Sequence, residues 1–211
     1  METLIGRKKE IAELHRLAQT GASEFVALYG RRRVGKTFLI RNVYQKEIVF
    51  QMTGIAGVDK AQQLSNFFSA FQAAATGNSN EPMPGDWFTA FGLLRAFLEK
   101  DKRDKKVVFF DELPWIDTFR SGFLSALEHF WNSWASARTD IVLVVCGSAA
   151  SWMLSKLINN KGGLYNRVTQ KIRLLPFTLQ EVEAYFSMKN VVLDRYQIIQ
   201  LYMALGGFLF I

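Results

Sequence analysis

The sequence has very little cysteine and no long apolar run, and both absences restrict its class. Cys146 is the only cysteine among 211 residues, so no intramolecular disulfide can form, which favours a reducing, cytoplasmic location. No apolar run reaches the roughly 18 residues that a membrane-spanning helix needs. The N-terminus leads directly into a charged segment without a signal peptide. A disulfide-rich secreted domain and a membrane-spanning protein are therefore both disfavoured.

Motifs for several other chemistries are missing as well. We find no zinc-ligand spacing, no RNA-binding aromatic signature and no internal repeat. His15 and His129 lie in segments of helical periodicity and are interpreted as structural. No histidine is visibly paired with Cys146, so this thiol is interpreted as a small core residue. The guanine-reading pattern Asn-Lys-x-Asp is absent, which favours an adenine nucleotide over a guanine one.

Positive charge is in excess. The net charge is +7, and Lys and Arg cluster at residues 7–9, 31–33 and 100–106. This balance permits contact with nucleic acid or an anionic surface, although part of the charge is needed for nucleotide phosphates alone.

The most specific signal is a phosphate-binding loop at residues 30–37. These residues match the pattern G-x-x-x-x-G-K-[ST]. An apolar run at 25–29 predicts a buried strand before the loop, and residues 38–43 predict a helix after it. This strand–loop–helix setting is the one that the motif requires, and a chance match is on the order of 1%. The alternative is an ordinary glycine turn beside a surface lysine.

The chemistry of phosphate binding explains this spacing. Gly30 and Gly35 allow successive backbone N–H groups to face one anion, and the following helix directs its positive end to the same place. Lys36 can then reach the β- and γ-phosphates, and the Thr37 hydroxyl can hold Mg²⁺. The arginine side chains either raise the local potential for phosphate or form a solvated basic rim. The predicted nucleotide contacts are Gly30, Arg31, Arg32, Arg33, Val34, Gly35, Lys36, Thr37 and Phe38.

Apolar strands alternate with amphipathic helices along the first 175 residues. Strands are predicted at 25–29, 47–52, 107–110, 141–145 and 171–175. Aromatic stripes at helical spacing are interpreted as core; they include Phe67, Phe71, Trp87, Phe91, Phe123, Phe130 and Trp131. The alternation predicts an α/β fold with a parallel sheet covered on both faces and its loops gathered at one edge.

A pair of carboxylates follows the third predicted strand, about 75 residues after the phosphate loop. Asp111 can hold Mg²⁺ together with Thr37. Glu112 is placed to activate the attacking water as general base. The alternative is two solvated carboxylates at the end of a strand.

Two further polar residues are candidates for sensing the γ-phosphate. Ser148 follows the fourth strand, and it is either a γ-phosphate sensor or the N-cap of the next helix. Arg167 precedes the fifth strand and can act on a γ-phosphate in cis or in a neighbouring subunit. The alternative for Arg167 is a surface or ion-paired arginine.

A different region begins after residue 175. Thr178 with Glu181 predicts a capping box, and Asp194 predicts a second helix cap. Ile198, Leu201 and Leu205 are expected to face inward, and Gly206-Gly207 ends the helix. We therefore expect an ATPase core at 1–175 and the beginning of a helical lid at 176–211. The apolar end at 208–211 leads us to expect that the full-length protein continues.

Together these segments resemble a known ATPase family. Residues 4–10, Leu-Ile-Gly-Arg-Lys-Lys-Glu, resemble the N-terminal box of AAA+ and STAND-type ATPases. The arginine-rich form of the phosphate loop is similar to that of the archaeal ATPase family, which also occurs in bacteria. The resemblance continues through Phe110-Asp111-Glu112, Gly147-Ser148, residues 164–167, Leu175-Pro176-Phe177 and Gly206-Gly207. Two departures are Ala149 after Ser148 and Phe208-Leu209 after the glycine pair.

This resemblance implies a P-loop NTPase three-layer sandwich with strand order 5-1-4-3-2. It also implies that Ile5 and Arg7 border the adenine, that ATP and Mg²⁺ are the cofactors, and that a lid responds to hydrolysis. Family members usually carry a C-terminal DNA-binding-like or nuclease-like region, so a DNA or protein partner is expected outside this chain. A homo-oligomer is compatible with the family.

Three functions follow as alternatives. The first is a Mg²⁺-dependent, ATP-hydrolysing switch. The second is a nucleotide-gated DNA-associated regulator or scaffold with negligible turnover. The third is a small-molecule kinase, against which the Asp111-Glu112 pair and the Gly6-Arg7 box favour water as the acceptor.

Overall fold

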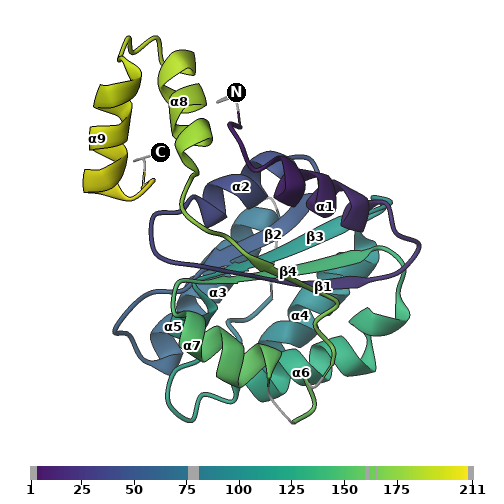
Figure 1. Ribbon diagram of the computed structural model, residues 1–211. Coiled ribbons are helices and arrows are strands. Elements are labelled where there is room, and N and C mark those ends of the chain that lie inside the picture. Colours follow the sequence, from purple (N-terminus) through teal and green to yellow (C-terminus); the bar gives the residue numbers. More distant parts are fainter. Residues whose placement is uncertain (1–3, 76–80, 160–161, 165, 209–211) are drawn as a thin grey trace.

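The predicted apolar runs fold as five parallel strands of one sheet (Figure 1). The computed structural model of the chain describes residues 4–75, 81–159, 162–164 and 166–208. The strands are β1 (Glu24–Tyr29), β2 (Ile48–Thr53), β3 (Lys106–Asp111), β4 (Ile141–Gly147) and β5 (Gln170–Arg173). Their order is β2-β3-β4-β1-β5, which confirms the predicted order 5-1-4-3-2 read from the other edge.

The register of the strands brings their carboxyl ends to one edge of the sheet. Tyr29 of β1 lies beside Gly147 of β4, and Thr53 of β2 lies beside Asp111 of β3. Every residue of β3 and β4 is buried, because these strands lie in the sheet interior with helices on both faces. Segments that are far apart in sequence therefore leave the sheet side by side.

Two helices cover one face of the sheet with an aliphatic core. They are α1 (Lys8–Ala18) and α2 (Lys36–Val43), which contribute Leu14, Leu17, Leu39 and Ile40. Cys146 of β4 is fully buried in this cluster, and burial raises the pKa of its thiol. The interpretation of Cys146 as a core residue rather than a nucleophile is confirmed, because its surroundings disfavour a thiolate.

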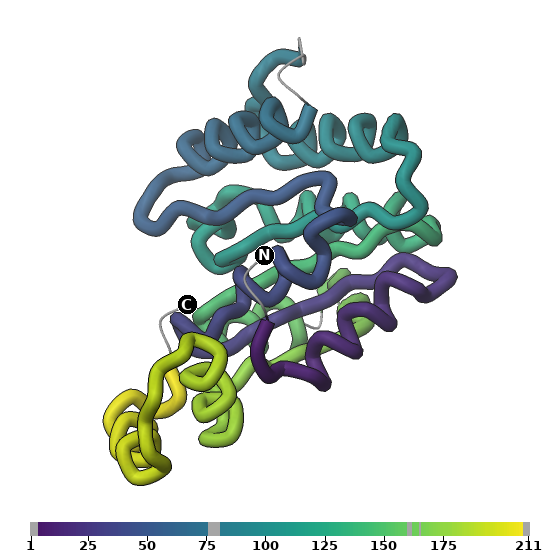
Figure 2. The backbone as a smooth tube through the Cα atoms, turned by 90° about the horizontal axis from the view of Figure 1, so that it is seen from above, coloured from purple at the N-terminus to yellow at the C-terminus, as the bar shows by residue number. Residues whose placement is uncertain are grey.

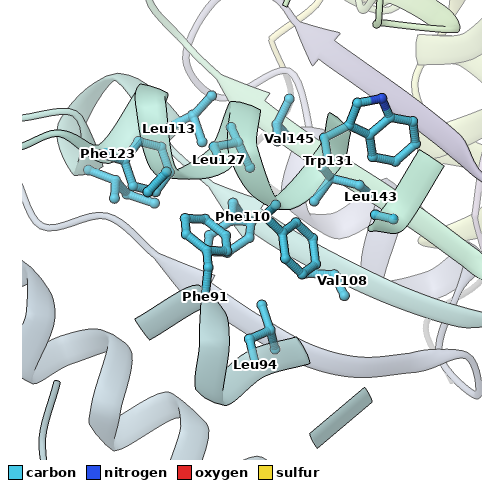
Figure 3. Packing of buried hydrophobic residues seen from close by; sticks show 14 of the residues in the cluster. Phe91, Leu94, Val108, Phe110, Leu113, Phe123, Leu127, Trp131, Leu143 and Val145 are labelled. Carbon is cyan, nitrogen blue, oxygen red and sulfur yellow. The ribbon is translucent and has the colours of Figure 1, made fainter. Parts of the chain in front are cut away.

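The other face carries a larger, aromatic core (Figure 3). It is covered by α3 (Lys60–Ala74), α4 (Trp87–Lys100), α6 (Phe123–Ser133), a 3₁₀ turn (Ala135–Ala137), the short α7 (Ala150–Trp152) and a π-helical segment (Met153–Ile158). Phe91 packs against Phe110 and Phe123, with ring centroids 5.7 and 5.9 Å apart. The helical stripes that the sequence predicted as core are therefore packed together between the sheet and its helices.

The last two helices project from one end of the sandwich (Figures 1 and 2). They are α8 (Leu179–Met188) and α9 (Arg195–Leu205), and both predicted caps are present as capping boxes. Only Ile198 of the three predicted inward residues is buried; Leu201 and Leu205 are 36% and 43% exposed. That expectation was wrong because two helices share only one seam, which here holds Phe177, Val182 and Ile198.

Candidate functional site

The phosphate loop joins β1 to α2 at the carboxyl edge of the sheet. Its two glycines are required by geometry. A side chain at Gly30 would collide with the backbone carbonyl of Leu174, and Gly35 has φ +85° where it caps α2. Arg33 also adopts a left-handed conformation, with φ 65°. The loop therefore has the backbone curl that a ring of N–H donors around an anion needs.

Lys36 is the first residue of α2, and its side chain is buried. Its Nζ atom donates hydrogen bonds to the carbonyl oxygens of Gly30 and Arg31, each at 3.0 Å. The ammonium therefore lies across the mouth of its own loop. A phosphate oxygen bound there would replace neutral acceptors with charged ones.

Thr37 and Asp111 meet as the sequence predicted, although they are 74 residues apart. The Thr37 hydroxyl donates to Oδ2 of Asp111 at 2.6 Å, and the backbone N–H of Glu112 donates to Oδ1 at 3.0 Å. Burial raises the pKa of Asp111, partly offset by the hydrogen bond from Thr37. A hydroxyl and a carboxylate at this spacing are suitable oxygen ligands for Mg²⁺.

Glu112 turns back toward the fourth strand. Its backbone has φ 49° and ψ 51°, a left-handed conformation that non-glycine residues seldom adopt. Its Oε2 atom accepts hydrogen bonds from the hydroxyl of Ser148 at 2.8 Å and from the backbone N–H of Ser148 at 3.1 Å. The N-cap alternative for Ser148 is wrong, since Ala149 precedes α7 and the Ser148 hydroxyl is directed to Glu112 instead.

Beside the loop lies a small, partly open apolar pocket with a cavity volume of about 30 Å³. Its lining includes the predicted residues Ile5, Arg7, Val34, Gly35 and Phe38, together with Leu4, Leu39 and four residues of the α8 region: Phe177, Tyr185, Met188 and Lys189. A space of this size holds little more than a water molecule, so an aromatic base would lie against the apolar wall rather than be enclosed by it.

Arg7 connects this pocket to α8. Its guanidinium donates to the carbonyl of Val34 at 3.3 Å and lies 4.5 Å from the ring centroid of Phe177. Its backbone N–H donates to Oε1 of Glu181 at 2.8 Å. Burial lowers the pKa of Arg7, and the neighbouring carboxylates of Glu181 and Glu10 oppose that effect. The cation is thus held among an aromatic ring, a loop carbonyl and a carboxylate.

Two of the loop arginines contact aromatic rings. The guanidinium carbon of Arg31 lies 5.0 Å from the ring centroid of Phe208, and that of Arg32 lies 5.1 Å from that of Trp115. Both arginines are exposed. The loop therefore has a basic rim, as one alternative held, and that rim also contacts the segment after α9 and the turn after β3.

Arg167 does not reach the phosphate loop of its own chain. Thr169, two residues later, donates its N–H to the carbonyl of Phe25 at the beginning of β1. Gly30 follows Phe25 by five residues at the other end of β1, so about 16 Å of extended chain separates the two. Arg167 is exposed at the opposite end of the sheet, so the alternative in which it acts in cis has no geometric support.

Sequence reasoning missed two contributors to the site. Glu181 was recognised only as a capping residue, but it also binds Arg7. Gln63 was not singled out, although it is fully buried and bridges two loops at this edge. The available signal for Gln63 was a polar residue directly preceding the apolar stripe of α3.

In the part of the chain that the structure describes, no three His, Cys, Asp or Glu side chains gather to hold a metal by themselves. None of the described helices is long and apolar enough to cross a bilayer.

Known proteins are similar to this chain in sequence and in fold. An uncharacterised protein of Methanocaldococcus jannaschii is 24% identical over 183 residues, covering 86% of this chain and 38% of its own length. The Walker-type ATPase PABY2304 of Pyrococcus abyssi superposes with a TM-score of 0.66 at 19% identity, covering 97% of this chain and 64% of that one. The ORC2 protein of Aeropyrum pernix, solved as ADPNP-ADP complexes, gives 0.61 at 17% identity, covering 93% and 56%.

The chain spans less than two thirds of the length of each of these three proteins. At these identities the structural likeness establishes the fold. The sequence profile of an ATPase domain found predominantly in Archaea matches residues 4–190, which is most of the chain. The chain therefore belongs to the family of ATPase domains that occurs predominantly in Archaea.

Proposed function

We propose that this domain binds ATP with Mg²⁺, hydrolyses it, and acts as a nucleotide-dependent switch. The observation that carries the proposal is the convergence of Lys36, Thr37, Asp111, Glu112 and Ser148 at one edge of the sheet. Each of these side chains is hydrogen-bonded within the site. Every one of those bonds can be exchanged for a bond to triphosphate, metal or water.

The proposed binding step uses groups that are already in place. Lys36 exchanges two carbonyl oxygens for phosphate oxygens, and the curled backbone of the loop supplies further N–H donors. Thr37 and Asp111 give up their mutual hydrogen bond to hold Mg²⁺, which neutralises phosphate charge when it is bound. Ile5, Arg7, Val34 and Phe38 provide the wall for the adenine.

The proposed hydrolytic step is favoured when Glu112 leaves Ser148. While Oε2 accepts two hydrogen bonds from Ser148, the carboxylate is a weaker base toward water. Once released, Glu112 can orient and deprotonate a water, and the Ser148 hydroxyl can donate to the γ-phosphate. The observed pairing is therefore a resting arrangement of the base.

The proposed switch runs through the arginines that connect the core to α8 and α9. Arg7 contacts both the loop carbonyl of Val34 and the Phe177–Glu181 segment, and Arg31 contacts Phe208 after α9. A phosphate bound at the loop competes for Arg31, and a base in the pocket contacts both Arg7 and α8 residues. Nucleotide occupancy would thus change how the two helices contact the core.

Arg167 fits this proposal only in trans. Its exposed place at the far end of the sheet allows it to reach the nucleotide of an adjacent subunit, where a guanidinium would stabilise charge on the transferred phosphoryl group. Concentration-dependent ATPase activity that Arg167→Ala abolishes is the expected result, and activity independent of protein concentration would contradict it.

Lys36→Ala tests binding. The variant should lose measurable ATP and ADP binding in isothermal titration calorimetry, because the ammonium that faces the phosphates is gone. Lys105→Ala is a matched control, since Lys105 also donates to two backbone carbonyls, those of Ala22 and Thr139, but at the opposite end of the strands. The control should bind normally. Equal binding by both variants would refute the assignment of the loop.

Glu112→Gln tests hydrolysis and separates the alternatives. The variant should bind ATP within about twofold of the wild type and release phosphate at least about 100-fold more slowly, since the general base is lost. Steady-state phosphate release without any added acceptor would exclude the kinase. Negligible release by the wild type, with DNA present or absent, would instead favour a regulator or scaffold.

A further inference from the structure

Gln63 is a buried polar residue that no step of the proposed mechanism uses. It lies in the first turn of α3 and is 0% exposed. Its Nε2 atom donates to the carbonyl of Ile55 at 2.7 Å and to the carbonyl of Trp115 at 2.8 Å, and its Oε1 accepts from the N–H of Ile55 at 3.4 Å. Burying an amide is costly unless its hydrogen bonds are made, and here one side chain joins three backbone groups.

The two segments joined by Gln63 both border the catalytic glutamate. Ile55 lies in the loop between β2 and α3, and Trp115 lies in the short helix α5 (Leu113–Ile116) that follows Glu112. The N–H of Trp115 donates to the carbonyl of Glu112 at 2.9 Å. Glu112 is the first residue of this turn, and Trp115 is three residues later. Gln63 therefore holds the turn through the carbonyl of Trp115.

Gly54, the residue before Ile55, contacts the same turn. Its N–H donates to the carbonyl of Asp111 at 2.9 Å. A side-chain carbon at Gly54 would lie 2.7 Å from the carbonyl oxygen of Glu112 and 2.8 Å from Cγ1 of Ile116. The loop after β2 is thus packed directly on the turn after β3, and the side chain of Gln63 hydrogen-bonds to both segments.

This packing accounts for the backbone of Glu112. A glutamate at φ 49° is in a region that costs energy for a residue with a side chain, and such residues persist only where the surroundings fix them. With the backbone held there, the carboxylate reaches Ser148 on β4. If the turn relaxed to negative φ, the carboxylate would leave the position from which it contacts Ser148 and from which it would be released to the water.

We propose that Gln63, supported by Gly54, is a positioning residue for the hydrolytic step. It sets the backbone of Glu112 without touching nucleotide, and it acts on turnover rather than on binding, because the phosphate loop is built from β1 and α2. This inference rests on the proposed function. Displacing a general base by about 1 Å can cost up to about 100-fold in rate.

The test compares Gln63→Met with Asn66→Leu. Gln63→Met keeps the length of the side chain and removes all three hydrogen bonds. Asn66 lies one turn later on α3 and donates its side-chain amide to the carbonyl of Thr53, so Asn66→Leu removes a similar bond that does not involve the Glu112 turn. Gly54→Ala pushes on the same turn at Glu112 and Ile116 without removing any buried polar group.

ATP affinity and stoichiometry are measured by calorimetry, and phosphate release is expressed per bound nucleotide. Gln63→Met and Gly54→Ala should each lower the rate per occupied site about 10-fold or more, with the dissociation constant for ATP within about twofold. Asn66→Leu should leave both unchanged. A purely structural role would lower the stoichiometry of binding while the rate per occupied site stayed normal, and this result would overturn the proposal.

If Gln63→Met does not fold, Gln63→Asn and Gly54→Ala decide the matter. Asn keeps an amide in the buried place but is one methylene too short to reach both carbonyls, so its rate per occupied site should also fall. Normal rates in both variants would overturn the positioning role. Failure of the proposed function is distinguishable, because the wild type itself would then release no phosphate.

Discussion

At the scale of single residues, the contact with Ser148 holds the carboxylate of Glu112 that we propose as the general base. The hydroxyl and the N–H of Ser148 both donate to the same oxygen. Removing the hydroxyl leaves the backbone donor in place, so the carboxylate keeps one of its two bonds. The side chain of Ser148 can therefore be tested separately from the fold of the turn.

We predict that Ser148→Ala lowers ATP turnover by about 10- to 100-fold and changes ATP affinity by less than about threefold, since a donor to the reacting phosphate is lost. Phosphate release and calorimetry measure the two quantities. Ser151→Ala, at an exposed position in α7, serves as a control and should be unchanged. A Ser148 variant with normal turnover would remove the sensor role.

Asp140 directly precedes β4, at the end of the sheet opposite the phosphate loop. Its carboxylate accepts from Arg138 at 2.7 Å and from the buried Lys106 at 2.6 Å. The hydrogen bond from Arg138, followed by that from Lys106, lowers the pKa of Asp140 from 3.8 to about 2. The folded-state pKa is depressed, so this stabilisation is present above pH 3.8 and is lost as pH falls toward 2.

Asp140→Asn should therefore lower the free energy of unfolding by about 2 kcal/mol or more at pH 7, because the charge pairing ends and Lys106 loses its buried anion. The difference from the wild type should shrink to about half at pH 3. Urea denaturation at the two pH values measures it. A difference that is constant with pH would show that the carboxylate's charge is not the cause.

At the scale of elements, the glycine pair after α9 decides how the two last helices meet the core. Gly206 has φ +64° and Gly207 has φ +73°. The N–H of Phe177 donates to the carbonyl of Gly207 at 3.1 Å, and a side chain at Gly207 would collide with the carbonyl of Phe177. A side chain at Gly206 would meet only the Phe208 ring, at 3.6 Å.

Gly207→Ala should detach the end of α9 from Phe177, whereas Gly206→Ala should cost only the left-handed backbone energy, about 1 kcal/mol. Limited proteolysis within residues 176–208 is the measurement. Cleavage should accelerate about fivefold for Gly206→Ala and more than about tenfold for Gly207→Ala. Equal rates for the two variants would mean that the collision at Gly207 is relieved without detachment.

Much of the arrangement of strands and loops was predictable from the sequence. The sequences of β3 and β4 are apolar because both faces of these strands are buried. The phosphate loop was recognisable from the spacing of Gly30 and Gly35. Leu201 and Leu205 were assigned wrongly because helical periodicity gives a stripe but not the number of neighbours that cover it. The roles of Gln63 and Glu181 depend on contacts 52 and 174 residues away in sequence, which no local pattern encodes.

The cis alternative for Arg167 was decided by a contact that is distant in sequence. The pairing of Thr169 with Phe25, 144 residues away, places the segment before β5 beside the beginning of β1. Ser148 was left between two roles because a serine after a strand is equally compatible with a helix cap and with a ligand. The structure directs its hydroxyl to Glu112.

At the scale of the whole molecule, nucleotide binding should stabilise the entire α/β core. The phosphate loop directly follows β1, and β1 lies between β4 and β5 in the sheet. At about 100 times the dissociation constant, a ligand adds about 2.7 kcal/mol, which raises the midpoint of thermal unfolding by about 5–10 °C for a chain of this size. Differential scanning fluorimetry with Mg²⁺ and ADP measures it. Lys36→Ala should show no shift, and an equal shift there would indicate binding elsewhere.

The strand order has a consequence for biosynthesis. The described neighbours of β1 in the sheet are β4 and β5, whose first residues, Ile141 and Gln170, are translated more than a hundred residues after Glu24. At about 5–20 residues per second, β1 waits on the order of 6–24 s for its first partner. The apolar segment and basic loop at 24–37 therefore emerge from the ribosome unpaired, and this nascent stretch is where a chaperone would be needed first.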